Sequence, residues 1–325
     1  MSAWHNELAF LFFHPMIPVL IIGSSAAGAS AAIYLARRNI SFVMVGSDFG
    51  GEMAQSGEVS NYPGCGQTNG VELSDKFLEH VKLYGVEPEL GVRITSLAKT
   101  DKGFLAKGWK DDPAHAVSYE ASSVIVATGS HPRELGIPGE KEFRGKGVSY
   151  CTVCDGPLYK NKTVVTIGGG DSANESGIMM NDIAKHAYVL TKNPDMKGDR
   201  SLIARVKAGT NTTVVPNAVT SRIVGTDFVT AVEYKDALTG ESKIIEAQGV
   251  FIHIGMIPNA EFVMPDLART VSGEIKIDAL GKTNVPGLFA AGDVTDMPYK
   301  QIGIAAGQGI IAALSCVDFL NKQAP

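Results

Sequence analysis

The sequence predicts an α/β fold in which one dinucleotide-binding domain is inserted into another. At two places an apolar strand runs directly into a glycine-rich turn and a helix: Ile17–Ile22 precedes Gly23–Gly28, and Thr163–Ile167 precedes Gly168–Ala173. A further apolar strand, ending in Gly-Asp at Gly287–Asp293, follows the second motif and returns the chain to the first domain. We therefore expect two nested Rossmann-like domains of the three-layer ββα type, the second inserted in the first.

The composition agrees with two globular domains. The chain has 325 residues, of which 45% are hydrophobic and 19% charged, and its formal net charge is −5. This balance excludes a disordered chain, and the acidic charge argues against a surface that binds nucleic acid. Four cysteines are too few for a disulfide scaffold in a chain of this length, so we expect a reducing, cytoplasmic location.

We expect an N-terminal extension at 1–16, a discontinuous first domain at 17–135 and 258–325, and an inserted second domain at 136–257. The joints fall in Gly/Pro-rich stretches, near Gly136–Gly139 and Gly255–Pro258.

The extension is not expected to cross a membrane. Its apolar stretch is interrupted by His14 and Pro15, and each uninterrupted part is shorter than the roughly 20 residues of a membrane span. No Lys or Arg precedes it and no small-residue cleavage site follows, so a signal peptide is not expected either. We predict that the extension packs on the body of the protein or frays.

The first glycine loop follows a strand that is apolar on both faces, as in a buried parallel sheet. Gly23 provides the tight turn, and Gly28 lets a helix, predicted from Ala26 to Arg38, pack closely on the strand. Ser25 replaces the middle glycine of the motif and is expected to crowd the approach of the phosphates. A second strand at 41–45 lacks the acidic residue that usually binds a ribose at its end, so other groups must hold an adenosine.

The rest of the first domain is predicted from hydrophobic periodicity. An amphipathic helix is expected at 71–85, a small meander at 92–110, and another buried strand at 122–129. Asp293 can accept hydrogen bonds from a ribityl chain and lies near a helix N-terminus. The helix after it, predicted at 302–320, is rich in Gly and Ala and can press closely on a flat ligand.

The second glycine loop fits the motif better than the first, because Gly168, Gly170 and Ala173 occupy its three required positions. A helix is predicted from Ser172 to about Lys185, and its N-terminal amides suit a pyrophosphate. Two such loops in one sequence, with a Cys-x-x-Cys pair just before the second, are a far more specific sequence signal than either loop alone.

The cysteine pair lies in Cys151-Thr152-Val153-Cys154-Asp155-Gly156. This spacing can close a small disulfide and lowers the pKa of one thiol, which then exchanges readily. A zinc site would need four ligands, but Cys65 and Cys316 are solitary and no suitably spaced histidine pair follows. Asp155 can protonate a leaving sulfur. We therefore predict a redox-active dithiol and no metal.

Together these motifs resemble those of the low-molecular-weight thioredoxin reductases, which are class II FAD-containing pyridine nucleotide-disulfide oxidoreductases. The resemblance extends from about residue 17 to 321, and the matching segments are Ser149–Gly156, Gly168–Ala173, Ala290–Val294, Asn61–Gly64 and Gln301–Ile302. It implies a homodimer with one FAD per subunit in the first domain. It also implies a nicotinamide site in the second domain and a thioredoxin-like protein disulfide as electron acceptor.

The resemblance also implies the role of each catalytic residue. Electrons pass from the flavin to the disulfide, and thiol–disulfide exchange then reduces the partner. Cys154 is the flavin-proximal sulfur, Cys151 the interchange thiol and Asp155 the acid/base, and the domains must rotate about the joints between the two steps. The FAD site is expected to comprise Gly23, Ser25, Ala26, Ala27, Gly28, Gly50, Gly51, Asn61, Ala127, Thr128, Gly129, Gly292, Asp293, Gln301 and Ile302.

The electron donor is the point at which the sequence departs from the family pattern. Members that use NADPH carry His-Arg-Arg-x-x-x-Arg after the second strand of domain two, where this chain has Thr191–Lys197. Lys192 and Lys197 lack the bidentate fork of arginine, and Asn193 takes the third position. We expect a nicotinamide site at Gly168, Gly170, Asp171, Ser172, Ala173, Lys192 and Lys197, with NADPH, NADH or a ferredoxin as possible donors.

The sequence therefore predicts a thioredoxin reductase-like flavoenzyme. One alternative is a flavin-bound redox sensor, in which the cysteine pair is a switch, since perturbed thiols suit sensing as well as catalysis. A second is a ferredoxin–nicotinamide flavoprotein reductase, which would not need the cysteines. Peroxiredoxin-linked flavoprotein reductases share these motifs but carry an extra redox module, for which we expect no room in this chain.

Overall fold

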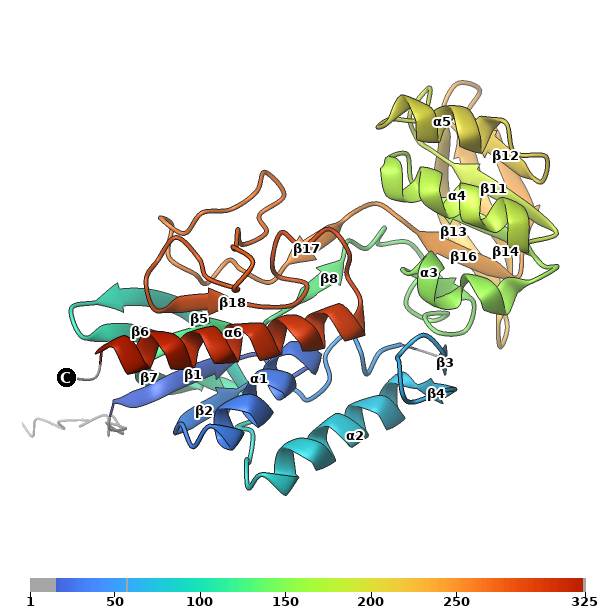
Figure 1. Cartoon of the computed structure of the whole chain (residues 1–325). Coiled ribbons are helices and arrows are strands. Elements are labelled where there is room, and N and C mark those ends of the chain that lie inside the picture. Colours follow the sequence, from blue (N-terminus) through green and yellow to red (C-terminus); the bar gives the residue numbers. More distant parts are fainter. Residues whose placement is uncertain (1–15, 57, 324–325) are drawn as a thin grey trace, which may run out of the picture. The chain divides into compact units, whose positions relative to one another are not determined.

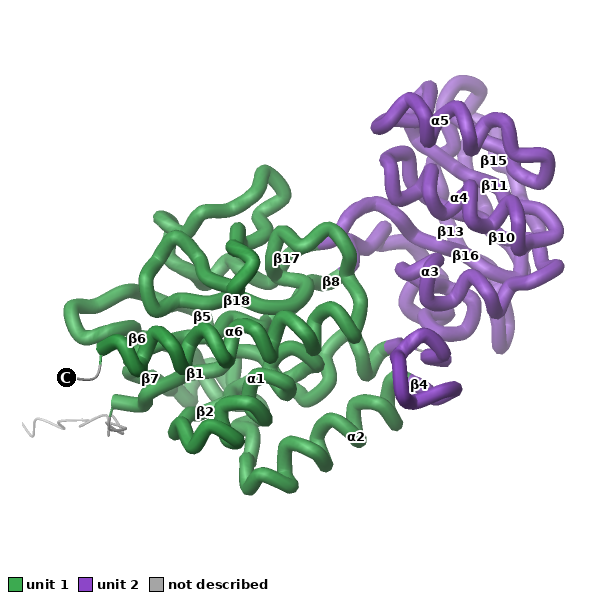
Figure 2. The backbone as a smooth tube through the Cα atoms, viewed as in Figure 1, with its two compact units in different colours: residues 1–55, 70–131, 257–325 green, residues 56–69, 132–256 purple. Residues whose placement is uncertain are grey.

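The computed structural model describes residues 16–56 and 58–323, which form two compact units (Figure 2). Unit 1 contains the described residues up to Gln55, Gly70–His131 and the described residues from Ile257 onward. Unit 2 contains Ser56–Asn69 and Pro132–Met256. The predicted extension at 1–16 lies outside the described residues, except for Met16.

Unit 1 is built on a sheet with the strand order β2-β1-β7-β6-β5, to which β18 is added beside β7 (Figure 1). Strands β2, β1, β7 and β18 are parallel, whereas β5, β6 and the first part of β7 form an antiparallel meander. The predicted meander is therefore confirmed. The strands are β1 Ile17–Ile22, β2 Phe42–Val45, β5 Val92–Thr100, β6 Gly103–Lys110, β7 Asp112–Val126 and β18 Leu288–Ala290.

Helices α1 (Ala26–Arg37) and α6 (Ile302–Gln323) pack against each other and against this sheet, and α2 spans Gly70–Leu83. A Cβ at Gly309 of α6 would lie 2.0 Å from the carbonyl oxygen of Ala27, so only glycine permits this approach. By length and composition α6 could cross a membrane, but half of its most apolar window is buried in unit 1. Its packing on α1 accounts for its apolar composition.

Unit 2 shows the predicted three layers. Its parallel sheet has the order β12-β11-β10-β16-β9, and an antiparallel sheet has the order β13-β14-β15. Val165 of β10 packs with Ile223 of the antiparallel sheet, whereas the adjacent Val164 packs with Met180 of α4. The elements are β9 Val148–Ser149, β10 Thr163–Ile167, α4 Asp171–Ile183, β11 His186–Leu190, α5 Arg200–Lys207, β12 Thr212–Val215, β13 Ala218–Gly225, β14 Val229–Asp236, β15 Ser242–Glu246 and β16 Gly249–Ile252.

The first joint lies earlier than predicted. The chain enters unit 2 at Pro132 and leaves it after Met256, and the strands that contain these crossings, β8 (Ser130–Pro132) and β17 (Met256–Pro258), pair with each other. Gly139, which the sequence placed at the joint, is fixed inside unit 2. A Cβ there would lie 2.0 Å from the carbonyl oxygen of Ile223.

The segment Ser56–Asn69 belongs to unit 2, although the sequence placed it in the first domain (Figure 2). Its short strands β3 (Glu58–Val59) and β4 (Thr68–Asn69) form an antiparallel hairpin, and β3 contacts α3 (Thr152–Asp155). This tertiary contact, which periodicity along the chain cannot reveal, accounts for the difference.

Candidate active site

The cysteine pair lies in one helical turn at the carboxyl edge of the parallel sheet of unit 2. Strand β9 ends at Ser149, and α3 begins directly after Cys151, which occupies its N-cap position. Cys151 and Cys154 form a disulfide, and their Cα atoms lie 5.3 Å apart. The pair predicted from the spacing is therefore in place, in a helical turn that the sequence did not predict.

The two sulfurs of the disulfide differ in their surroundings. The backbone amide of Cys154 donates a hydrogen bond to Cys151 Sγ over 3.2 Å, and the amide of Cys151 donates to Ser149 Oγ over 3.0 Å. Among the described residues no hydrogen bond is donated to Cys154 Sγ. An N-cap position and an amide donor are both surroundings that stabilise a thiolate, and among the described residues only the Cys151 sulfur has them.

Asp155 ends this turn, and its amide donates to the carbonyl oxygen of Cys151 over 3.1 Å. Burial raises the pKa of its carboxyl group, a hydrogen bond from Ser149 opposes this shift, and the negative charge of Glu58 adds to it. The carboxyl group therefore keeps its proton to a higher pH than an exposed aspartate does. Val153 is 60% exposed, so the turn leaves an apolar side chain accessible on its surface.

The backbone segments predicted to bind FAD converge in unit 1 at the carboxyl ends of β1, β7 and β18. A Cβ at Gly23, whose φ is +115°, would lie 2.1 Å from the carbonyl oxygen of Ala127, and one at Gly292 would lie 3.0 Å from Ala27 Cβ. The amide of Gly50 donates to the loop at Ser24 over 3.1 Å. The structure thereby brings together Gly23, Ser25, Ala26, Ala27, Gly28, Gly50, Gly51, Ala127, Thr128, Gly129, Gly292 and Asp293.

The backbone at Ser25 has nearly the conformation of its counterpart in the second glycine loop, and the crowding of the phosphates stays a prediction. The φ and ψ of Ser25 are −101° and −161°, nearly those of Gly170 at the same place in the second loop, −101° and −169°. Neither position needs a left-handed conformation, so a side chain is tolerated there. The Ser25 hydroxyl donates to the carbonyl oxygen of Gly50 over 2.5 Å, which ties the two turns together.

Asn61 is the one residue predicted to bind FAD that belongs to unit 2. It lies in the β3–β4 segment that belongs to unit 2, whereas the glycine loop and Gln301 and Ile302 at the start of α6 belong to unit 1. The role of Asn61 in FAD binding therefore stays a prediction.

The second glycine loop is built like the first. A Cβ at Gly168 would lie 2.2 Å from the carbonyl oxygen of His253, whereas one at Gly170 would meet nothing within 4 Å. Asp171 and Ser172 are exposed at the N-terminus of α4, where the helix offers amides to an anion. Predicted residues Gly168, Gly170, Asp171, Ser172 and Ala173 therefore lie together at the carboxyl end of β10.

The segment after β11 lies along this loop. The amide of Lys197 donates to the carbonyl oxygen of Gly169 over 2.6 Å, and the amide of Asp199 donates to the Asp171 carboxylate over 2.7 Å. Lys192 and Lys197 are exposed, but the same surface carries the carboxylates of Asp171, Asp195 and Asp199. The pKa of Asp195 is lowered by Lys207, and that of Asp199 by hydrogen bonds from Ser201 and Leu202. Together with Lys207, which pairs with Asp195, three ammonium groups thus accompany three carboxylates.

A family model described as pyridine nucleotide-disulphide oxidoreductase matches residues 17–309. The chain belongs to this family. A thioredoxin reductase from Streptococcus pyogenes has a similar structure, with a TM-score of 0.85 and 33% identity over 94% of this chain and 99% of that one. A ferredoxin-flavin thioredoxin reductase from Clostridium acetobutylicum is also similar, with a TM-score of 0.52 and 31% identity over 95% and 99% of the two chains.

Two curated relatives are longer than this chain. It is 41% identical to a Bacillus subtilis protein named NADH dehydrogenase, over 94% of this chain and 58% of that protein. It is 38% identical to a Staphylococcus aureus protein named as part of an alkyl hydroperoxide reductase, over 94% and 59%. This chain therefore spans less than two thirds of the length of either relative.

FAD and a nicotinamide nucleotide are the cofactors typical of this pyridine nucleotide-disulphide oxidoreductase family, and unit 1 has buried polar groups that fit FAD. Burial raises the pKa of Asp293, and no described residue donates a hydrogen bond to its carboxylate. Ser130 Oγ, just beyond the Gly129 turn, is buried without a hydrogen-bond partner among the described residues. Both groups lie near the converging loops and call for a polar ligand.

Two polar residues of the active site were missed by the sequence reasoning. Ser149 receives the amide of Cys151 and hydrogen-bonds Asp155, and His253 hydrogen-bonds the Thr152 side chain within the redox turn. The sheet order explains why these two residues lie close together, because β16 is paired with both β9 and β10 and all three strands are parallel. A sequence signal exists only in retrospect: each residue lies at the carboxyl end of a strand of the second domain, where ligands of such sheets bind.

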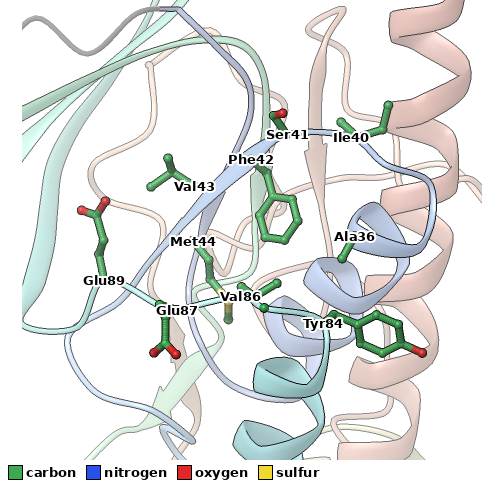
Figure 3. A pocket seen from close by; sticks show the side chains of 11 residues that line it. Ala36, Ile40, Ser41, Phe42, Val43, Met44, Tyr84, Val86, Glu87 and Glu89 are labelled. Atoms are coloured by element: carbon green, nitrogen blue, oxygen red, sulfur yellow. The ribbon is translucent and has the colours of Figure 1, made fainter.

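A cavity of about 390 Å³ lies elsewhere in unit 1 (Figure 3). It is lined by the end of α1, by β2 and by the segment after α2, and Figure 3 shows Phe42, Tyr84 and Glu87 around it. None of the predicted site residues lines it. Within the described ranges no group of three His, Cys, Asp or Glu side chains is arranged to hold a metal ion.

We expect Asp155→Asn to make the protein more stable near neutral pH while slowing disulfide exchange. Because the folded-state pKa of Asp155 is raised, its ionised form opposes folding above the folded-state pKa, and this penalty disappears as the pH falls below the ordinary value of 3.8. The thermal midpoint of Asp155→Asn should therefore exceed that of the wild type at pH 7 and converge with it in acid. Exchange should slow by about 100-fold or more, the usual contribution of a general acid.

Asp195→Asn is the matched control. Its pKa is lowered by Lys207, whose Nζ lies 2.7 Å from the carboxylate, so its ionised form favours folding and the substitution should not stabilise the protein at pH 7. A thermal midpoint for Asp155→Asn at or below that of the wild type at pH 7 would contradict the burial of an ionised carboxylate.

Proposed function

We propose that this protein is a disulfide reductase of the thioredoxin reductase type. Electrons reach the Cys151–Cys154 disulfide with the help of FAD and pass on to the disulfide of a thioredoxin-like protein. The observation that carries the proposal is the asymmetric redox turn, in which an amide donates to Cys151 Sγ while no such bond to Cys154 Sγ is found within the described ranges.

FAD would be held by the converging unit 1 loops and by Gln301 and Ile302, and it supplies two electrons per turnover. The reduced Cys151 thiolate attacks one sulfur of the partner's disulfide, forms a mixed disulfide and displaces a partner thiolate. That thiolate takes a proton from the protonated form of Asp155, which the raised pKa of this carboxyl group makes more abundant than in an exposed aspartate. Cys154 then returns its thiol proton to Asp155 and attacks Cys151 Sγ, which restores the disulfide of the reductase and releases the second partner thiolate. This thiolate takes up a proton from solvent, so that the partner gains two electrons and two protons.

The charges of the second unit argue against NADPH as the preferred donor. Its 2′-phosphate would approach a surface on which three carboxylates balance the ammonium groups of Lys192, Lys197 and Lys207, and lysine lacks the bidentate geometry of an arginine clamp. NADH has no such phosphate, and a relative with 41% identity is named NADH dehydrogenase. A ferredoxin is the second candidate donor, because a similar structure is that of a ferredoxin-flavin thioredoxin reductase. We therefore propose that NADPH has no advantage over NADH.

Anaerobic stopped-flow bleaching of the bound flavin with NADPH, NADH and a reduced ferredoxin in parallel tests this proposal. We expect the rates with NADPH and NADH at equal concentration to differ by less than about threefold. Changing Lys192, Asn193 and Lys197 together to arginine should improve NADPH alone by about 10- to 100-fold, the scale of charge-assisted hydrogen bonds. Fast bleaching of the wild type by micromolar NADPH but not NADH would contradict the proposal.

The acceptor could differ from a thioredoxin, because other relatives are named as parts of alkyl hydroperoxide reductases. Turnover with an oxidised thioredoxin-like protein, in the presence of the donor identified above, distinguishes a reductase from a redox sensor: only a reductase sustains many turnovers. We propose, further, that the protein works as a homodimer in the reducing cytoplasm, where such a disulfide is catalytic and not structural. Sedimentation of the FAD-loaded protein tests the dimer.

A further inference from the structure

A chain of buried polar side chains lies directly behind the redox turn. His253 Nε2 lies 2.7 Å from Thr152 Oγ1, Thr152 Oγ1 lies 2.7 Å from Ser176 Oγ, and Ser176 Oγ lies 2.8 Å from Thr166 Oγ1. The three hydroxyl-bearing residues are at most 3% exposed. Four elements contribute to this chain: the redox helix α3, α4, β10 and the residue that follows β16.

This arrangement places His253 between two functional segments. Because β16 lies between β9 and β10 in the sheet, the residue after it lies between the redox turn and the second glycine loop. The His253 amide donates to the carbonyl oxygen of Ile167 over 2.7 Å, and its own carbonyl oxygen lies against Gly168. The backbone of His253 is thus fixed by the sheet, while its imidazole reaches the redox turn.

Thr152 links this row of hydrogen-bonded side chains to the cysteines. It is the first residue of α3 and follows Cys151 directly. Its hydroxyl lies within hydrogen-bond distance of both His253 and Ser176. The amide that donates to Cys151 Sγ comes from the same turn, two residues later. A shift of Thr152 would therefore change the orientation of that amide relative to the sulfur.

We propose that His253 is a positioning residue for disulfide exchange, which acts through Thr152 to hold the redox turn in the geometry that stabilises the Cys151 thiolate. This inference rests on the proposed function, since it assigns a role within the same site. Burial lowers the pKa of His253 to about 4, so the imidazole is neutral at working pH. A neutral ring can accept from or donate to Thr152 and so complete the hydroxyl chain in either direction.

The test measures the reactivity of the Cys151 thiol directly, without turnover. In a Cys154→Ser background, which keeps the backbone amide of that position, the rate of alkylation of Cys151 by iodoacetamide is followed against pH by mass spectrometry of its peptide. FAD-loaded protein is used throughout. Since alkylation needs neither an electron donor nor an acceptor, failure of this inference is distinguishable from failure of the proposed function.

We expect His253→Ala to lower the alkylation rate at pH 7 by about three- to tenfold, because loss of one hydrogen bond lets the turn shift and raises the pKa of the thiol. His253→Gln, whose amide can still reach Thr152, should restore the rate to within about twofold of the background. Thr152→Val should reproduce the loss, and combining it with His253→Ala should add little, because both changes break the same contact.

His186→Ala is the matched control, because His186 Nε2 makes a similar bond to Thr213 Oγ1 over 2.9 Å on neighbouring strands that do not lead to the redox turn. It should leave the alkylation rate unchanged. An unaltered rate in folded His253→Ala, or a loss in His253→Gln as large as in the alanine variant, would overturn the proposal. If His253→Ala does not fold, Thr152→Val and His253→Gln decide: a loss confined to Thr152→Val supports the proposal, and any other result contradicts it.

Discussion

Replacing either Cys151 or Cys154 by serine should abolish reduction of a thioredoxin-like disulfide protein, a loss of at least about 1,000-fold in kcat/KM, because each sulfur forms a bond that no other group can form. FAD binding should survive in both variants, since the cysteines belong to unit 2 and all the FAD loops except Asn61 belong to unit 1. Absorbance of the bound flavin and steady-state reduction of the partner measure the two properties.

The two variants should also differ from each other. Reduced Cys154→Ser keeps the Cys151 thiol, so it should trap the oxidised partner in a stable mixed disulfide, visible on a non-reducing gel. Cys151→Ser should trap far less. Cys65→Ser and Cys316→Ser are the controls and should keep full turnover, because neither lies in the redox turn and burial raises the pKa of Cys316 to about 11. Trapping by Cys151→Ser instead would reverse the roles of the two sulfurs.

Glu140→Ala should destabilise the protein by about 2–3 kcal/mol, the scale for losing hydrogen bonds to a charged group. Glu140 is 1% exposed, and its carboxylate accepts from the amides of Leu135 and Gly136 over 2.8 and 2.7 Å and from the Tyr150 hydroxyl over 2.9 Å. Without it, three donors on half-buried or exposed residues lose their acceptor. Urea unfolding followed by circular dichroism measures the change.

This network borders the redox turn, because Tyr150 precedes Cys151. Burial and the hydrogen bond to Glu140 raise the pKa of Tyr150, so the phenol remains a donor at all working pH values. Glu142→Ala is the matched control: Glu142 is exposed and accepts one amide, that of Gly139, over 3.2 Å, so its loss should cost less than about 1 kcal/mol. An equal loss in the free energy of unfolding for both variants would show that the buried Glu140 carboxylate stabilises the protein no more than the exposed Glu142 does.

Much of the fold could be predicted because strand, glycine turn and helix are adjacent in the sequence. The apolar run Ile17–Ile22 is β1, and the alanine-rich helix predicted to follow it is α1, Ala26–Arg37. The same holds for β10 and α4 in unit 2. The hydrophobic pattern and the positions of Gly23 and Gly168 suffice to predict these elements. At both glycines the surrounding backbone leaves no space for a Cβ.

The cysteine chemistry was also predictable, because Cys151 and Cys154 are close in sequence and their spacing alone permits the disulfide. Which of the two cysteines is the more reactive could not be predicted from their spacing. That Cys151 receives an amide at an N-cap, and that Asp155 is buried enough for its pKa to rise, depends on how α3 packs. Neither burial nor an N-cap in a single helical turn leaves a periodic signal in the sequence.

The sequence by itself determined the two nucleotide loops, the nesting and the redox pair, because each depends on residues that are neighbours along the chain. Only the tertiary structure decided that Ser56–Asn69 joins unit 2, that Ser25 turns its hydroxyl to Gly50, and that His253 reaches Thr152. These contacts join residues separated by up to 101 positions. The contact of His253 with Thr152 exists because parallel pairing places the carboxyl ends of β9, β16 and β10 side by side, and strand order is a property of the folded sheet, not of any local segment.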